Sequence, residues 1–121
     1  MQELKLRWAT GKGDLILWWK DKELKILGRM ATPEEEKRLT TWAKEQGLTI
    51  EGDLAQEATI HADPDLLKRA LTDLVKKDVQ AVGYVVYGVN KKGKGKVLAH
   101  HSEVELEKFT EVARVPQVKG G

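Results

Sequence analysis

Alternation of apolar and polar side chains over the first 27 residues constrains the fold more than any other feature. Apolar residues occupy every second position in three short runs: Leu4, Leu6, Trp8, Leu15, Leu17, Trp19, Leu24 and Ile26. Because successive side chains of a strand point to opposite faces, this period indicates half-buried strands. Turn sequences separate the runs at residues 11–14 and 21–22. The pattern therefore predicts a three-stranded antiparallel meander over residues 3–28.

The same alternation assigns the residues of the opposite face: Lys5, Arg7, Ile16, Trp18, Lys20, Lys25 and Leu27. We expect this face to be basic, with Glu23 at its edge as the nearest acid. Long lysine stems could simply cover Trp18 in solvent, or another element such as a third helix could cover the face. Alternatively, Trp18 could stack on a nucleic-acid base between phosphate-binding cations, or anchor a protein interface.

Three helices are predicted from capping residues. Thr32 and Asp63 each precede a proline, which favours the first position of a helix, so helices are expected after both residues. Ser102 and Glu105 have the spacing of a capping box and predict a third helix up to residue 113. Further strands are expected at residues 48–51, 58–62, 79–89 and 96–101.

This order of elements predicts an α+β fold. We expect a mainly antiparallel sheet, made of the N-terminal meander and a C-terminal hairpin, with about three helices packed on one face. The length of 121 residues suits a single domain, which we assign to residues 1–113. Residues 114–121 contain Pro116 and end in two glycines, so they are expected to form a flexible tail.

Composition narrows the class of protein. Charged residues make up 33% of the chain, the formal net charge is +2, and no apolar run is long enough to span a membrane. There is no cysteine, which excludes disulfides, thiolate metal sites and a cysteine nucleophile. The first residues show strand-like alternation and no secretory signal, so a cytoplasmic location without membrane partners is expected. The scarcity of thermolabile residues favours a thermophilic source.

Candidates for catalysis and metal binding are few. His100 and His101 are adjacent in an expected strand and should point to opposite faces, and His61 could join one of them only through the tertiary fold. Ser102 is explained by helix capping, and no separated pair of acids suggests acid–base chemistry. We therefore expect a binding protein with no catalytic residue, no metal and no cofactor.

Residues 91–96 combine four lysines with two glycines and no acid. Lysines release counterions when they bind nucleic acid, and glycines allow close approach of the backbone. The sequence thus predicts non-specific nucleic-acid binding, with Trp18 stacking on a base and phosphate contacts from Lys5, Arg7, Lys20, Lys25, Lys91, Lys92, Lys94 and Lys96. The pI of about 8.8 is below that of most such proteins, so local segregation of charge is required.

The alternative is a protein–protein interaction module that uses the Trp18 face. Such a module could be a homodimer, or an inhibitor or accessory subunit of a larger complex. The nearly balanced charge suits this alternative equally well.

Overall fold

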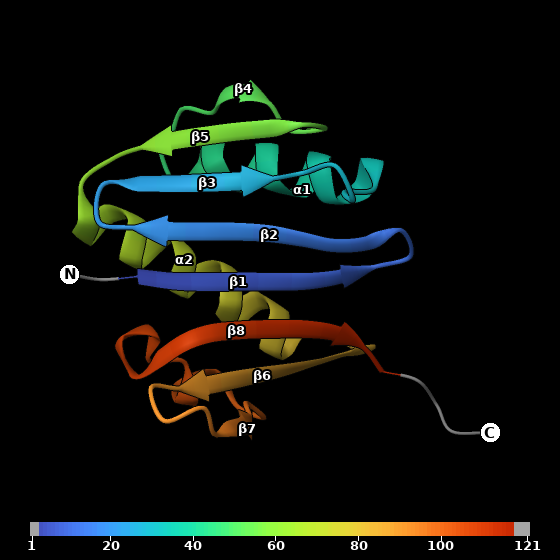
Figure 1. Ribbon diagram of the computed structural model, residues 1–121, viewed down its shortest axis with the longest axis vertical. Coiled ribbons are helices and arrows are strands. Elements are labelled where there is room, and N and C mark those ends of the chain that lie inside the picture. Colours follow the sequence, from blue (N-terminus) through green and yellow to red (C-terminus); the bar gives the residue numbers. More distant parts are fainter. Residues whose placement is uncertain (1–2, 118–121) are drawn as a thin grey trace.

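Eight strands form one sheet in the computed structural model, which describes residues 3–117. The strands are β1 (Glu3–Thr10), β2 (Gly13–Lys20), β3 (Glu23–Leu27), β4 (Glu51–Asp53), β5 (Glu57–His61), β6 (Tyr84–Asn90), β7 (Gly95–Val97) and β8 (Phe109–Pro116). Their order across the sheet is β4-β5-β3-β2-β1-β8-β6-β7 (Figure 1). Among the strand pairs of this region only β1 and β8 run parallel, so the sheet is mostly antiparallel, as predicted.

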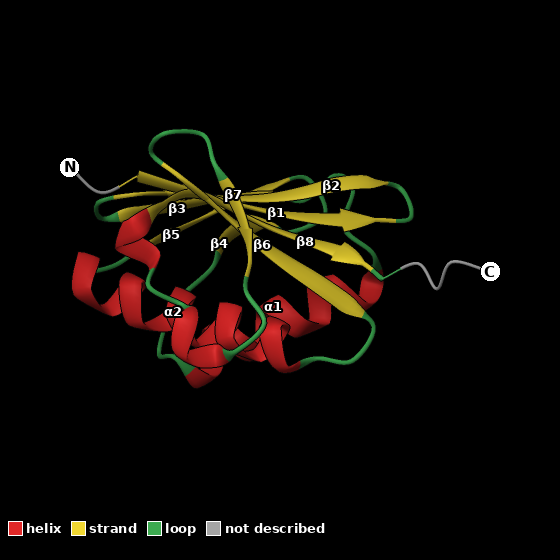
Figure 2. Ribbon diagram, turned by 90° about the horizontal axis from the view of Figure 1, so that it is seen from below, coloured by secondary structure: helices red, strands yellow, loops and turns green. Residues whose placement is uncertain are grey.

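Two α-helices, α1 (Pro33–Glu45) and α2 (Pro64–Gln80), lie on the same face of the sheet in this part of the chain (Figure 2). Both predicted N-caps are confirmed. The Thr32 hydroxyl accepts a hydrogen bond from the Glu35 backbone N–H, and the Asp63 carboxylate accepts one from that of Asp65. These contacts satisfy backbone donors that a helix start leaves without partners.

The register of the predicted meander is confirmed. Leu4 pairs with Trp19, and Trp19 pairs with Leu24, so the three apolar runs share one face. That face is directed toward the helices, and Trp19 is only 1% exposed. Its indole N–H donates to the Asp21 carbonyl over the turn at residues 21–22.

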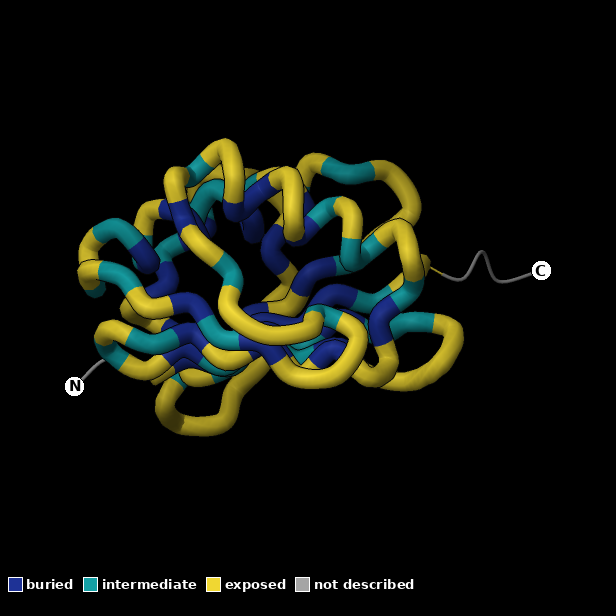
Figure 3. Tube along the Cα trace, turned by 90° about the horizontal axis from the view of Figure 1, so that it is seen from above, coloured by how far each residue is buried: buried dark blue, intermediate teal, exposed yellow. Residues whose placement is uncertain are grey.

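The core lies between the sheet and the two helices, where the buried residues concentrate (Figure 3). Leu39 and Trp42 of α1 and Leu67 and Leu71 of α2 are buried against the sheet. The indole of Trp42 also donates a hydrogen bond of 2.9 Å to the Ala70 carbonyl, which joins the two helices. Burial of these side chains is the main source of stability.

The predicted third helix is wrong. Residues 101–108 form two short 3₁₀ turns, η1 (His101–Glu103) and η2 (Leu106–Lys108), and the chain then continues as β8. The capping box involves His100 and Glu103 rather than Ser102 and Glu105. The spacing of Leu106, Phe109 and Ala113 suits a helix, but pairing with both β1 and β6 overrides this local preference.

Strand β8 corrects two further predictions: the make-up of the sheet, and the start of a tail after residue 113. The prediction made the sheet from the meander and a hairpin alone, whereas β8 lies between β1 and β6 as an additional strand and connects the two parts. The expected domain boundary at residue 113 falls within this strand, and the Gln117 N–H donates to the Gly83 carbonyl at 2.8 Å. The rest of the expected tail, residues 118–121, lies outside the described residues.

Neither helix within residues 3–117 has the length and apolar character needed to cross a membrane.

Candidate nucleic-acid interface

We call the sheet face opposite the two helices the outer face (Figure 2). Trp18 lies on it, because its neighbours Leu17 and Trp19 are buried on the helix side and side chains alternate along β2. Trp18 pairs with Lys5 of β1 and Lys25 of β3, and its side chain is half-buried. The prediction that Trp18 points outward while Trp19 points into the core is therefore confirmed. No helix of the described chain covers the outer face, so the alternative that a third helix buries Trp18 is excluded.

Two ammonium groups lie against the Trp18 ring. The Nζ atoms of Lys5 and Lys20 are 4.9 and 4.7 Å from the ring centroid, within the range of a cation–π contact. The indole Nε1 donates a hydrogen bond of 3.0 Å to Oε1 of Glu3. The ring is thus held in one orientation, with two cations beside it.

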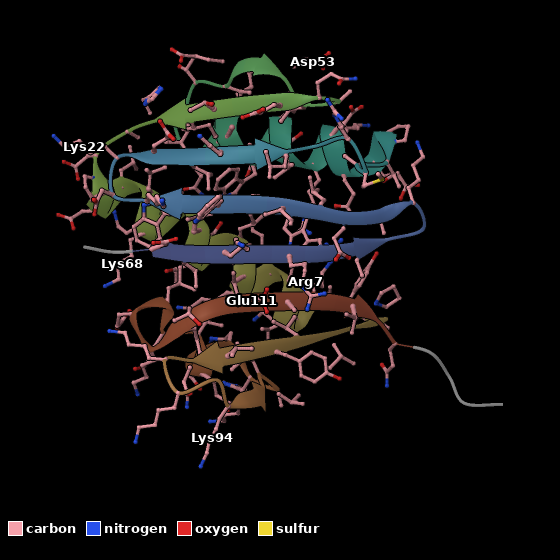
Figure 4. All side chains as sticks on the ribbon, in the orientation of Figure 1. Arg7, Lys22, Asp53, Lys68, Lys94 and Glu111 are labelled. Atoms are coloured by element: carbon pink, nitrogen blue, oxygen red, sulfur yellow. The ribbon has the colours of Figure 1, made fainter. Side chains whose placement is uncertain are left out.

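The outer face is less basic than the sequence suggested. Arg7 lies 3.5 Å from Asp14 and 3.4 Å from Glu111, and Lys25 lies 3.9 Å from Glu23. Figure 4 shows Arg7 and Glu111 directed toward each other over β1 and β8. Glu111 was not expected here, because residue 111 was assigned to a helix. Ion pairs this exposed contribute only about 0–1 kcal/mol each, so a competing anion can replace them.

The loop at residues 91–94 presents three lysines in solvent. The side chain of Asn90 accepts hydrogen bonds from the backbone N–H groups of Lys92 and Lys94, which orders the loop. Gly93 has a φ of 80°, which this turn requires and which glycine adopts without strain. Within the described residues, Lys91, Lys92 and Lys94 form no ion pair, whereas Lys96 lies 3.0 Å from Glu103.

The predicted phosphate-binding residues fall into two groups. Lys5, Lys20, Lys25 and Arg7 surround Trp18, whereas the loop lysines lie beyond β1, β8 and β6. Four strand spacings of ~4.8 Å separate β2 from β7, or roughly 19 Å. The loop projects to the outer side of the sheet (Figure 2), while Lys94 points away from the β7 edge (Figure 4).

A groove lies between the two groups. Its volume is about 500 Å³, and its lining residues are Glu3, Lys5, Trp18, Val89, Thr110 and Glu111. Val89 directly precedes Asn90 at the base of the loop, so the groove extends from Trp18 toward the loop lysines.

Sequence reasoning missed a buried charge cluster on the helix side of the sheet. The Arg114 guanidinium lies 4.4 Å from the ring centroids of both Trp8 and Tyr84 and donates to Asp78 and Glu35. Burial raises the pKa of Asp78, and the nearby Arg38 and Arg114 oppose this effect. The sequence carries one sign of this cluster: Asp78 follows Leu71 and Leu74 at helical spacing, so its carboxylate falls on the apolar face of α2. The cluster joins α1, α2 and β8, and we assign it to the fold.

The histidines are placed differently from the prediction. His100 and His101 lie outside the strands, and their ring centroids are 4.3 Å apart rather than on opposite faces. The His100 Nδ1 lies 2.7 Å from the Ser102 hydroxyl, while His61 lies 3.8 Å from Glu51. No group of three metal-ligating side chains occurs within residues 3–117.

Comparison of the chain with family models, curated proteins and solved structures gives no match. Fold and site together define a mixed α+β protein with one open sheet face.

Proposed function

We propose that the protein binds single-stranded nucleic acid through the outer face, without sequence specificity and without catalysis. The observation that carries this proposal is the position of Trp18, half-exposed on a helix-free face with two ammonium groups against its ring. An aromatic ring beside cations is the combination that single-strand-binding proteins use.

Binding begins with a base that stacks on Trp18. The base displaces Lys5 or Lys20 from the ring, and the displaced ammonium group then binds a phosphate of the same strand. Such stacking contributes about 1–3 kcal/mol per base and tolerates any sequence, because every base has a π face. A duplex keeps its bases stacked inside, so the protein prefers single strands.

The loop lysines supply the second electrostatic contribution. Lys91, Lys92 and Lys94 have no ion pair to break within the described structure, so they can bind phosphates directly. Arg7, Lys25 and Lys96 first have to leave their acidic partners, which lowers their contribution. We therefore rank the three loop lysines above these three residues as phosphate contacts.

Titration of labelled oligonucleotides by fluorescence anisotropy at several salt concentrations tests this proposal. For single strands, the logarithm of the binding constant should fall with the logarithm of salt by about 0.7 per phosphate contact. Replacing Lys91, Lys92 and Lys94 with glutamine should reduce this slope. The matched control replaces Lys37, Lys44 and Lys76 of the helices with glutamine and should leave the slope unchanged.

A second candidate is a protein partner, or a second copy of the chain, bound to the same face. It is favoured by three apolar side chains exposed there: Leu27, Tyr87 and Val97, at 36, 37 and 49%. A chain that binds no oligonucleotide and has the mass of a dimer in solution would refute the nucleic-acid proposal and support this one.

A further inference from the structure

A second aromatic side chain, Tyr87 of β6, lies on the outer face. We infer that Trp18 and Tyr87 stack on two bases of the same nucleic-acid strand, so that the bound strand crosses β1 and β8 between them. This inference rests on the proposed function and adds to it the minimum length and the path of the ligand.

Three observations place Tyr87 on this face. It pairs with Ala113 of β8 and with Val97 of β7. Its neighbour Val86 is buried at 2% exposure on the helix side, and a Cβ atom at Gly88 would lie 2.5 Å from the Phe109 ring. Alternation along β6 therefore directs Tyr87 outward.

The Tyr87 ring is available for a ligand. The side chain is 37% exposed and forms no hydrogen bond or ring contact with any residue from 3 to 117. By contrast, Tyr84 is 38% exposed but lies on the helix side, with the Arg114 guanidinium 4.4 Å from its ring centroid. The two tyrosines thus form a matched pair with similar exposure on opposite faces.

The spacing of the two rings sets the length of the ligand. Three strand spacings separate β2 from β6, and the paired rows that contain Trp18 and Tyr87 are offset by two residues. With ~4.8 Å between strands and ~3.4 Å per residue, the two Cα positions are roughly 16 Å apart. A stacked strand rises ~3.4 Å per nucleotide, so about five stacked steps, or fewer extended ones, cover this distance.

Arg7 lies between the two rings. It pairs with Ile16 on one side and Ala113 on the other, and Ala113 in turn pairs with Tyr87. Arg7 and Tyr87 are thus in one paired row of the sheet, with the short Ala113 side chain between them. A phosphate between the two bases can replace the exposed Asp14 and Glu111 carboxylates as the partner of Arg7.

Binding of oligothymidylates of increasing length, from two nucleotides to about eight, tests the inference. Affinity of the wild-type protein should rise once a strand reaches both rings, because the second contact becomes intramolecular. Tyr87→Leu should lose about tenfold or more in affinity for the long strands and little for the dinucleotide. Tyr87→Phe keeps an aromatic ring and should retain the wild-type length dependence, and Tyr84→Leu should leave it unchanged.

The outcomes separate the inference from the proposed function. If Tyr87→Leu keeps the wild-type length dependence while Trp18→Ala loses binding, the shared strand is refuted and the proposed function remains. An equal loss of affinity for oligothymidylates of every length in Tyr87→Leu would also refute the inference, because only strands long enough to reach both rings should depend on Tyr87. If the wild-type protein binds no oligothymidylate, both proposals fail.

Discussion

The guanidinium of Arg114 donates through Nη1 to Oδ1 of Asp78 at 3.2 Å, and both side chains are only 3% exposed. Asp78 lies near the end of α2 and Arg114 near the end of β8. Arg38 of α1 approaches the same carboxylate at 2.6 Å. One buried carboxylate therefore connects both helices to a strand that is distant in sequence.

Loss of this carboxylate should destabilise the fold strongly. Asp78→Ala leaves the buried Arg114 without one of its two acidic partners, which is expected to cost about 3–5 kcal/mol of unfolding free energy. Urea unfolding measures this loss. Asp73→Ala, five residues earlier in α2 and half-exposed, is the control and should cost about 1 kcal/mol or less. Equal losses in the two variants would show that burial of the pair has no special role.

The two adjacent tryptophans of β2 should respond differently to truncation. Trp19→Ala removes a ring that is 1% exposed and should cost about 3–5 kcal/mol of stability. Trp18→Ala removes a half-buried ring with two exposed cation–π contacts and a hydrogen bond to Glu3, and it should cost less, about 1–2 kcal/mol, while oligonucleotide binding falls. Thermal or urea unfolding of both variants checks this difference. Similar destabilisation by both would place Trp18 in the core.

Gly88 is expected to tolerate no side chain. A Cβ atom there would lie 2.5 to 2.7 Å from three atoms of the Phe109 ring, so Gly88→Ala should cost about 1–3 kcal/mol through overpacking. Gly95→Ala in the neighbouring β7 meets no atom within 4 Å and serves as the control. Adding Phe109→Leu should recover part of the loss, as a double-mutant cycle by urea unfolding would measure. Strict additivity of the two changes would argue against direct contact.

Glu103 should contribute a pH-dependent stability. The Lys96 ammonium and the N–H groups of His100 and Ala99 hold the pKa of Glu103 below its ordinary value of 4.5. The unfolded chain therefore binds the proton more readily, and the contribution present above pH 4.5 is lost as the pH falls through the lower folded-state pKa. Glu103→Gln should thus differ from the wild type most at neutral pH.

Unfolding of the wild type and Glu103→Gln on both sides of pH 4.5 gives the measurement. The difference in stability between them should shrink on the acid side. A difference that stays constant with pH would mean that the charge of Glu103 contributes nothing to folding.

Side-chain alternation was sufficient to predict the meander and its two faces. The register follows from parity, since a shift of one residue would move Trp18 and Lys5 into the core. Strand β8 could not be predicted in the same way. The spacing of Leu106, Phe109 and Ala113 satisfies a helix, and only the distant partners β1 and β6 make this segment a strand.

The candidate site was predictable only in part, for the same reason. Trp18, Lys5 and Lys20 belong to neighbouring strands, so local sequence places them together. Glu111 reaches Arg7 through β8, and Tyr87 joins the outer face through β6, so neither could be placed before the long-range pairing was known. Asn90 was recognisable in principle, because asparagine often orders a turn through its side chain.

The parallel pairing of β1 with β8 has a consequence for synthesis of the chain. The meander leaves the ribosome before β8 does, and the free edge of β1 stays without this neighbour until residues 109–116 have also emerged. Contacts between segments this far apart close slowly, so the nascent protein exposes the edge of β1 until β8 has been made and has paired with it.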